Sequence, residues 1–216
     1  IKVFEQLKNL GTKTKFLVEA YYSLVTLSLD KGDASAAKGY LLELKKLIRS
    51  GSGGIGAAQI ALLEGLIEEA LKRYPRAIDQ FNKASAQGDG EVGSQAQMGI
   101  ARCKIAMKKP ADAAKGILRF VKRPRTSKQY AEAYLLMGHA LKAQARAPDD
   151  WEKALMAYVR VHLRYPGDEK TESRALYEAA GCYRRIGGDK GVKRSAQLLA
   201  MLKRKYPNSP FLKEGR

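Results

Sequence analysis

Histidine and cysteine, the side chains that most often carry catalysis or bind metals, are scarce in this chain of 216 residues. There are two histidines, His139 and His162, and two cysteines, Cys103 and Cys182. Neither histidine has a cysteine or carboxylate at metal-ligand spacing, and neither forms a recognisable pattern with a nucleophile and an orienting acid. We therefore expect no metal, no cofactor and no enzymatic activity. A catalytic triad assembled only in space would leave no sequence signature and stays the alternative.

A glycine-rich segment at residues 51–56 matches the letters of the dinucleotide-binding pattern GxGxxG. That motif needs a strand before it and a helix N-terminus after it, because the backbone amides must face the pyrophosphate. Here the segment follows an amphipathic stretch that carries Leu41, Leu44 and Ile48 at helical spacing. We interpret it as a loop between two helices and expect no nucleotide site.

Positive charge is a stronger signal. Lysine and arginine number 40 against 22 aspartates and glutamates, a formal net charge of +18. Such a surplus favours anionic partners, namely nucleic acid, acidic peptides or anionic lipid. The surplus is uneven, because residues 102–128 hold ten basic residues against one acidic, and residues 184–205 hold eight against one. The alternative interpretation is a basic surface that meets only water.

The first basic block is densest at a predicted turn. Its candidate basic patch consists of Lys122, Arg123, Arg125 and Lys128. Basic side chains there could bind phosphate groups or acidic side chains. The cations of the block fall on more than one stripe of their helices, for example Arg102 on one and Lys104 on another. We therefore expect any binding to nucleic acid or an anionic membrane surface to be weak and non-specific.

A spaced pattern, small-x3-large-x2-apolar, recurs along the chain at intervals of about 30 to 50 residues. It occurs at Ala37-Leu41-Leu44, Ala77-Phe81-Ala84, Ala154-Tyr158-Val161 and Ser195-Leu199-Leu202. Repeats of this length are typical of solenoids, in which each unit buries its apolar face against its neighbours. The pattern predicts an all-α solenoid of about five helical hairpins.

Apolar stripes and helix breaks place the repeat units at about 15–49, 57–88, 94–123, 128–166 and 171–207. Residues 1–14 have the pattern of a remnant of a preceding helix, and residues 208–216 that of the start of a further unit or of a tail. Neither end carries the polar cap that a solenoid needs for solubility. We therefore expect a fragment of a longer protein that can associate through the exposed ends of the array.

Turn residues predict where individual helices begin and end. Gly32 supplies a left-handed C-terminal turn. Tyrosine–proline pairs at 165–166 and 206–207 end two second helices, because the residue before proline is pushed out of helical geometry. Aspartate 149 or 150 is expected to cap the helix that Trp151 opens. In the third unit, registers that start at Ala113 and at Ala114 both fit the pattern.

Aromatic residues and both cysteines fall on the packing positions of these helices. The aromatic residues concerned are Tyr21, Tyr74, Phe81, Trp151, Tyr158 and Tyr177. Aromatic side chains used in a core cannot stack on bases, so single-stranded nucleic acid is not the first choice of partner. Cys103 and Cys182 lie two repeats apart, and neighbouring repeats stack roughly 10 Å apart. We expect small buried thiols and no disulfide.

The cellular location stays open between the bacterial periplasm or envelope and the cytoplasm. Charged residues interrupt the apolar stretches every few positions, so the sequence predicts no transmembrane helix. The cysteines, being predicted as buried, give no information on the redox compartment.

The repeat units resemble the tetratricopeptide repeat family over nearly the whole chain. Tyr134, Met137 and Gly138 match its first-helix trio of bulky, apolar and small residues, and the residues at 177, 180 and 181 are similar. Gly65 and Ala77 have the spacing of the family's two small residues. The Tyr-Pro-Asn-Ser-Pro sequence at 206–210 is weakly similar to bacterial envelope members. Glutamates at 64 and 68 depart from the family, which has apolar residues there.

The resemblance implies a right-handed superhelix that acts as a scaffold for a peptide or protein partner, with the first helices lining a concave groove. The groove positions it implies are Tyr22, Leu62, Leu66, Met98, Arg102, Leu135, His139, Lys142, Glu178 and Arg185. A structural or solvated role is the alternative for His139 and the expectation for His162. The set lacks the lysine and asparagine arrangement with which some members clamp a C-terminal carboxylate, so we expect no binding of that kind.

Overall fold

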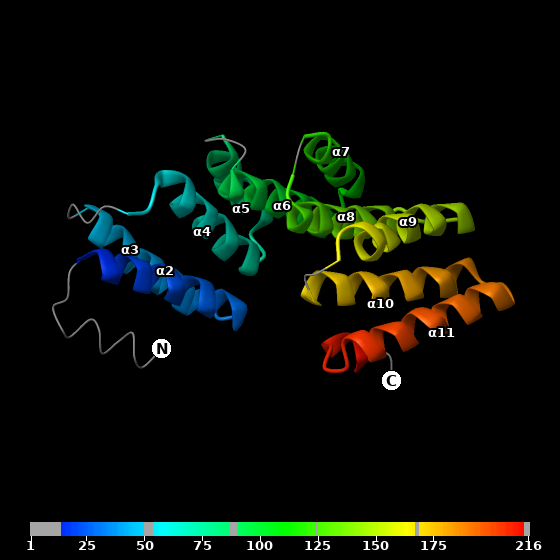
Figure 1. Cartoon of the computed structure of the whole chain (residues 1–216). Coiled ribbons are helices and arrows are strands. Elements are labelled where there is room, and N and C mark those ends of the chain that lie inside the picture. The colour runs from blue at the N-terminus through cyan, green and yellow to red at the C-terminus, as the bar shows by residue number, and fades with distance from the viewer. Residues whose placement is uncertain (1–13, 50–53, 87–89, 124, 167–168, 214–216) are drawn as a thin grey trace. The chain divides into compact units, whose positions relative to one another are not determined.

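The structure is a computed structural model that describes residues 14–49, 54–86, 90–123, 125–166 and 169–213. Within these ranges it contains ten α-helices, a terminal 3₁₀ turn and no strand (Figure 1). The predicted all-α fold of helical hairpins is therefore confirmed. The described residues contain no helix long and apolar enough to cross a membrane. The expected helix remnant at the N-terminus lies almost wholly outside the described residues.

The helices follow one another in pairs, first helix and second helix. Their bounds are α2 Thr14–Asp30, α3 Ala34–Arg49, α4 Ala57–Ala70, α5 Tyr74–Ser85, α6 Glu91–Ala106, α7 Pro110–Val121, α8 Ser127–Lys142, α9 Pro148–Arg164, α10 Glu169–Ile186 and α11 Gly188–Lys205, with the 3₁₀ turn η1 at Pro210–Leu212. The chain divides within α6 into two compact units, residues 1–103 and 104–216. In the first unit α4 packs on α2, α3 and α5, and α2 also packs on α3. In the second unit α8, α9 and α10 pack on one another. There α7 also packs on α8, and α11 packs on α10.

The recurring pattern forms the core of each hairpin. The small residues that open the second helices, Ala37, Ala77, Ala154 and Ser195, are all at most 3 % exposed. In the third hairpin the register is that of Ala113, because Ala113, Ile117 and Phe120 are at most 2 % exposed. Leu118 of the other register is 52 % exposed.

Aromatic rings pack directly on glycine backbones where the helices cross. A Cβ atom at Gly65 or Gly99 would lie 2.5 Å from the Phe81 ring, and one at Gly138 would lie 2.3 Å from the Tyr158 ring. These are the crossings where only a small residue lets two backbones approach. The fifth hairpin differs, because nothing lies within 4 Å of a Cβ placed at Gly181.

Most of the predicted helix ends are confirmed. Gly32 has a φ of +77°, and α9 and α11 end directly before the tyrosines of the two tyrosine–proline pairs. The predicted start of α9 is wrong, since the helix begins at Pro148 and not at Trp151. Proline suits a first turn because it has no N–H to leave unpaired. The Asp150 carboxylate folds back one turn to accept hydrogen bonds from the backbone N–H groups of Arg146 and Ala147.

Both cysteines are buried and free, as expected. Burial raises the pKa of the Cys103 thiol to about 12 and that of the Cys182 thiol to about 11. At neutral pH both are therefore neutral, and they serve as small core residues.

Candidate binding surfaces

The glycine-rich segment lies between two helices. Residues 51–53 are outside the described residues, but α3 ends at Arg49 before the segment and α4 begins at Ala57 after it. A dinucleotide-binding motif would need a strand in the place of α3. The described residues also hold no cluster of three or more histidines, cysteines, aspartates or glutamates that could bind a metal ion.

The predicted groove positions of the first unit divide into core and surface residues. Leu62 and Met98 are 1 % and 2 % exposed, so these two positions were wrongly placed in a groove. Leu62 belongs to the core cluster around Phe81 and Ala77. Tyr22 and Leu66 are half-buried and pack against the cores of their hairpins.

Arg102 is the charged groove position of the first unit, and it connects two first helices. Its Nε and Nη2 atoms donate hydrogen bonds to the two carboxylate oxygens of Glu69, at 2.8 and 2.9 Å. A two-pronged contact of this kind fixes the planar guanidinium in one orientation. The side chains of Arg102 and Glu69 are 32 % and 20 % exposed, so the pair stays partly accessible.

In the second unit the structure brings two predicted groove positions, His139 and Lys142, to a third, the Glu178 carboxylate, which is 7 % exposed. Lys142 on α8 donates to it at 2.6 Å, and Arg174, one turn earlier on α10, donates at 3.1 Å. His139 Nε2 lies 3.7 Å away and has no hydrogen-bond partner within the described residues. The His139 ring meets the buried Tyr158 edge-on at 5.6 Å, so it points toward the hairpin core as much as toward a groove.

Burial sets the protonation of this cluster. Burial lowers the pKa of His139 to about 4, and Arg174 and Lys142 add to that effect while Glu178 opposes it. Burial alone would raise the pKa of Glu178, but the hydrogen bond from Lys142 and the surrounding cations outweigh it and hold that pKa below its ordinary value. The pKa of Tyr158 is raised, mainly by burial. At neutral pH the cluster is a carboxylate bound by two cations beside a neutral imidazole.

The other two groove positions of the second unit lie apart from Glu178. Leu135 is half-buried against the core cluster around Tyr158. Arg185 is exposed, with its guanidinium 5.8 Å from the centre of the Trp151 ring. The predicted groove is thus partly assembled, with a charged centre in each unit and apolar positions that face mostly inward.

The predicted basic patch is only partly a patch. Lys122, Arg123 and Lys128 are exposed around the α7–α8 turn. Arg125 instead closes that turn, with its guanidinium 4.0 Å above the Phe120 ring and its Nε donating to the Phe120 carbonyl at 3.3 Å. Stacking and a backbone hydrogen bond fix that arginine in the turn.

A second buried carboxylate, Glu172, was not predicted. It is fully buried, with His162 Nδ1 at 2.7 Å, Lys205 Nζ at 2.5 Å and the Tyr206 hydroxyl at 2.7 Å. These donors come from α9, from the last residue of α11 and from the residue after it. A buried carboxylate needs such donors to offset its lost hydration. We refer to these four residues as the Glu172 cluster.

Lys205→Met is expected to lower the free energy of unfolding by about 1 to 3 kcal/mol, because it removes a charge-assisted hydrogen bond from a carboxylate that cannot reach water. The hydrogen bond to Glu172 raises the pKa of Lys205, in accord with this contact. The measurement is urea unfolding followed by circular dichroism. Lys203→Met is the matched control, since Lys203 is exposed on the same turn of α11. Equal stability of the two variants would contradict a stabilising role for the cluster.

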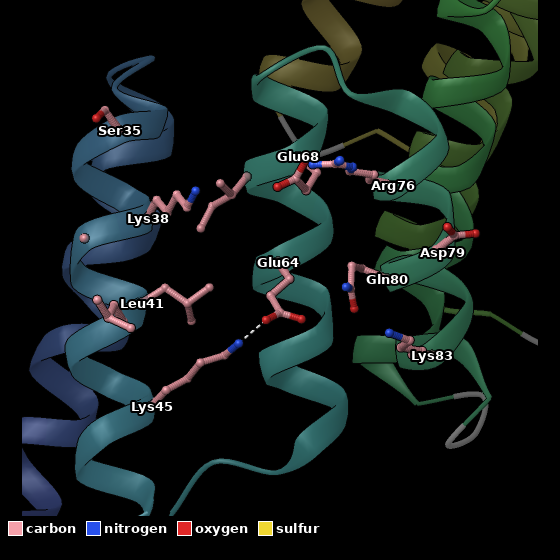
Figure 2. A pocket seen from close by; sticks show the side chains of 13 residues that line it. Ser35, Lys38, Leu41, Lys45, Glu64, Glu68, Arg76, Asp79, Gln80 and Lys83 are labelled. Atoms are coloured by element: carbon pink, nitrogen blue, oxygen red, sulfur yellow. Dashed lines mark hydrogen bonds and ion pairs between the residues drawn. The ribbon is translucent and has the colours of Figure 1, made fainter.

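A groove that the sequence did not predict runs along α4 between α3 and α5, and we call it the α3–α5 groove (Figure 2). Two adjoining hollows of about 540 and 560 Å³ form it, and they share Lys45, Glu64, Gln80 and Lys83. Lys45 and Glu64 form an ion pair across it. The signal in the sequence was the pair of glutamates at 64 and 68, which stand where the resembled family has apolar residues.

Comparisons with known proteins support the fold. No family model matches the chain, and no curated protein matches it. Among solved structures, the apo form of RapI superposes with a TM-score of 0.65 at 15 % identity, covering 98 % of this chain and 61 % of RapI. BtubC (BKLC) from P. vanneervenii superposes with a TM-score of 0.62 at 17 % identity, covering 96 % of this chain and 90 % of BtubC. At such identities the likeness shows the helical-repeat fold alone.

Proposed function

We propose that the protein is a non-enzymatic scaffold that binds a peptide or protein partner across its first helices, on a tetratricopeptide-like array. The observation that carries the proposal is the pairing of charges between consecutive first helices. Arg102 on α6 binds Glu69 on α4, and Lys142 on α8 binds Glu178 on α10. Each pair holds a long cationic side chain in place while leaving it partly exposed, at 32 % for Arg102 and 44 % for Lys142.

Fixed side chains favour binding because association then has to immobilise the partner but not the side chains of the scaffold. Immobilising a flexible lysine or arginine on association costs about 0.5 to 1.5 kcal/mol, and intramolecular ion pairs have already met much of that. Half-buried apolar residues, Leu66 in the first unit and Leu135 in the second, lie on the same first helices. A surface of fixed charges beside apolar positions is typical of peptide-binding scaffolds.

Site-specific photocrosslinking tests where the partner binds. A benzophenone amino acid at Leu66 or Leu135 is expected to form adducts in an extract of the source organism, and to keep them after nuclease treatment. The control positions are Leu118 and Met156, which are exposed on second helices at 52 % and 61 %. Adducts confined to the control positions would reject the first-helix surface, and adducts lost on nuclease treatment would reject a protein partner.

A second candidate function is non-specific binding to nucleic acid or an anionic membrane surface, and α11 is the observation that favours it. Six lysines and arginines stand in this helix against one aspartate. Lys190, Lys193, Arg194, Lys203 and Arg204 are exposed and form no ion pair within the described residues. Unpaired cations along one helix attract polyanions with a strong dependence on salt. In the crosslinking experiment this function is the nuclease-sensitive outcome.

A further inference from the structure

The α3–α5 groove lies on a different side of α4 from the first-helix positions. Glu64 and Glu68 line the groove, whereas Leu66 of the proposed first-helix surface is two residues from each of them, which corresponds to a rotation of about 200° around a helix. Its walls are second helices, α3 and α5. A ligand in this groove would therefore bind independently of the proposed first-helix partner.

The length of the groove suits a short extended segment. Its lining runs along α4 from Ala57 to Glu68, which is about 16 Å at the rise of an α-helix. An extended peptide of about five residues covers the same distance. Leu41 and Ile67 contribute apolar lining, and Leu42 on the rim is 57 % exposed.

Two enclosed acceptor atoms in the lining lack donors. Glu68 Oε2 and Gln80 Oε1 are shielded from solvent and have no hydrogen-bond partner within the described residues. The nearest charged contact of Glu68 is Arg73, whose Nη1 lies 3.8 Å from the other oxygen. An enclosed acceptor without a partner is unfavourable. Turning the Glu68 and Gln80 side chains toward a ligand that offers N–H groups therefore breaks no hydrogen bond to these two oxygens and forms new ones.

The charges of the lining select the sign of the ligand. Five cations line the two hollows, namely Lys38, Lys45, Arg49, Arg76 and Lys83. Three acids oppose them, Glu64, Glu68 and Asp79, and Glu64 is already paired with Lys45. Figure 2 shows Lys45 and Lys83 at one end of the groove and Glu68 with Arg76 at the other. The excess of cations in the lining favours a ligand with acidic side chains and disfavours one with lysine or arginine. The hydrogen-bond donors for Glu68 and Gln80 are therefore better supplied by neutral groups of the ligand.

We propose that the α3–α5 groove binds an extended, acidic peptide segment of a partner protein. The Glu68 and Gln80 side chains turn their enclosed oxygens toward the segment and accept hydrogen bonds from its main-chain N–H groups, and its acidic side chains face Lys83 and Arg49. Alternate residues of an extended strand turn their N–H groups to the same side, about 7 Å apart, which lets one segment reach two acceptors. This site lies between the second helices α3 and α5 and is additional to the proposed binding surface on the first helices.

The test is selection of blocked heptapeptides from a random library on the immobilised full chain. N-terminal acetylation and C-terminal amidation exclude recognition of free termini. We expect the enriched peptides to carry a net negative charge. We also expect them to lack proline at two positions that are two residues apart, because proline has no N–H to donate there. In fluorescence anisotropy, N-methylation at those positions is expected to weaken binding about 3- to 10-fold per hydrogen bond removed.

Three variants locate the site. Gln80→Leu and Lys83→Ser are each expected to weaken the selected peptides about 3- to 10-fold. Lys193→Ser on α11 is the matched control for charge and is expected to leave their affinity unchanged. Enrichment of basic peptides, no enrichment at all, equal weakening by Lys193→Ser, or indifference to N-methylation would each overturn the proposal. Self-association abolished by Lys83→Ser would also overturn it, by making the occupant a second copy of the chain.

Discussion

Phe81→Ala is expected to lower the free energy of unfolding by about 3 to 5 kcal/mol, among the largest effects of any single substitution in the chain. The Phe81 ring is fully buried and packs on the backbones of Gly65 in α4 and Gly99 in α6. Its removal opens a cavity where three helices meet, which glycines cannot fill. Urea unfolding followed by circular dichroism measures the loss. Leu118→Ala, at an exposed position of the second helix α7, is expected to change stability by less than about 0.5 kcal/mol.

A double-mutant cycle separates this packing from a general loss of core. Gly99→Ala alone is expected to destabilise by about 1 to 3 kcal/mol, because its Cβ would lie 2.5 Å from the Phe81 ring. In the Phe81→Ala protein the same change finds space, so its effect is expected to shrink or reverse sign. Strict additivity of the two substitutions would show that the ring and the glycine are not in contact.

Acidification is expected to destabilise the protein through His139. Its pKa is about 4 in the folded protein against an ordinary value of 6.5, so the unfolded chain binds more protons between these two values. Stability contributed by the neutral imidazole is complete above pH 6.5 and is lost as the pH falls to 4, by up to about 3 kcal/mol. The lowered pKa of Glu178 adds a loss of the same sign, but only below that carboxyl's ordinary value of 4.5.

His139→Gln is expected to flatten the dependence of the unfolding free energy on pH between 6.5 and 4.5. The other histidine, His162, is present in both proteins, so the difference between the two curves isolates His139. The measurement is urea unfolding at half-unit pH intervals. A variant that retains the full slope would show that the imidazole is solvated and not held neutral beside Arg174 and Lys142.

The repeat spacing made the fold predictable because it expresses local physical rules. A small residue must stand where two helices cross, and a large one must fill the space beside it, so Ala77 with Phe81 and Ala154 with Tyr158 could be assigned from spacing alone. The third hairpin was the exception. Two registers one residue apart fitted the sequence equally well, and only burial distinguished Ala113 from Ala114.

The candidate surfaces were less predictable because they depend on how far each helix is covered. Leu62 was placed in a groove by analogy, but α4 packs on α2, α3 and α5, which bury it on several sides. A helix covered in this way is apolar around most of its circumference, so its pattern does not distinguish core from groove. The Glu172 cluster joins residues 10, 33 and 34 positions apart, and no spacing rule connects them.

The Glu172 cluster also determines how the end of the second unit opens. The carboxylate on α10 takes its donors from α9 on one side and from the end of α11 on the other. If α11 separates from α10, the buried charge loses two of those three donors, so fraying of the last helix is penalised well before the hairpin as a whole unfolds. We therefore expect α11 to open together with α10 instead of peeling away singly, as a terminal helix held by apolar contacts alone would do.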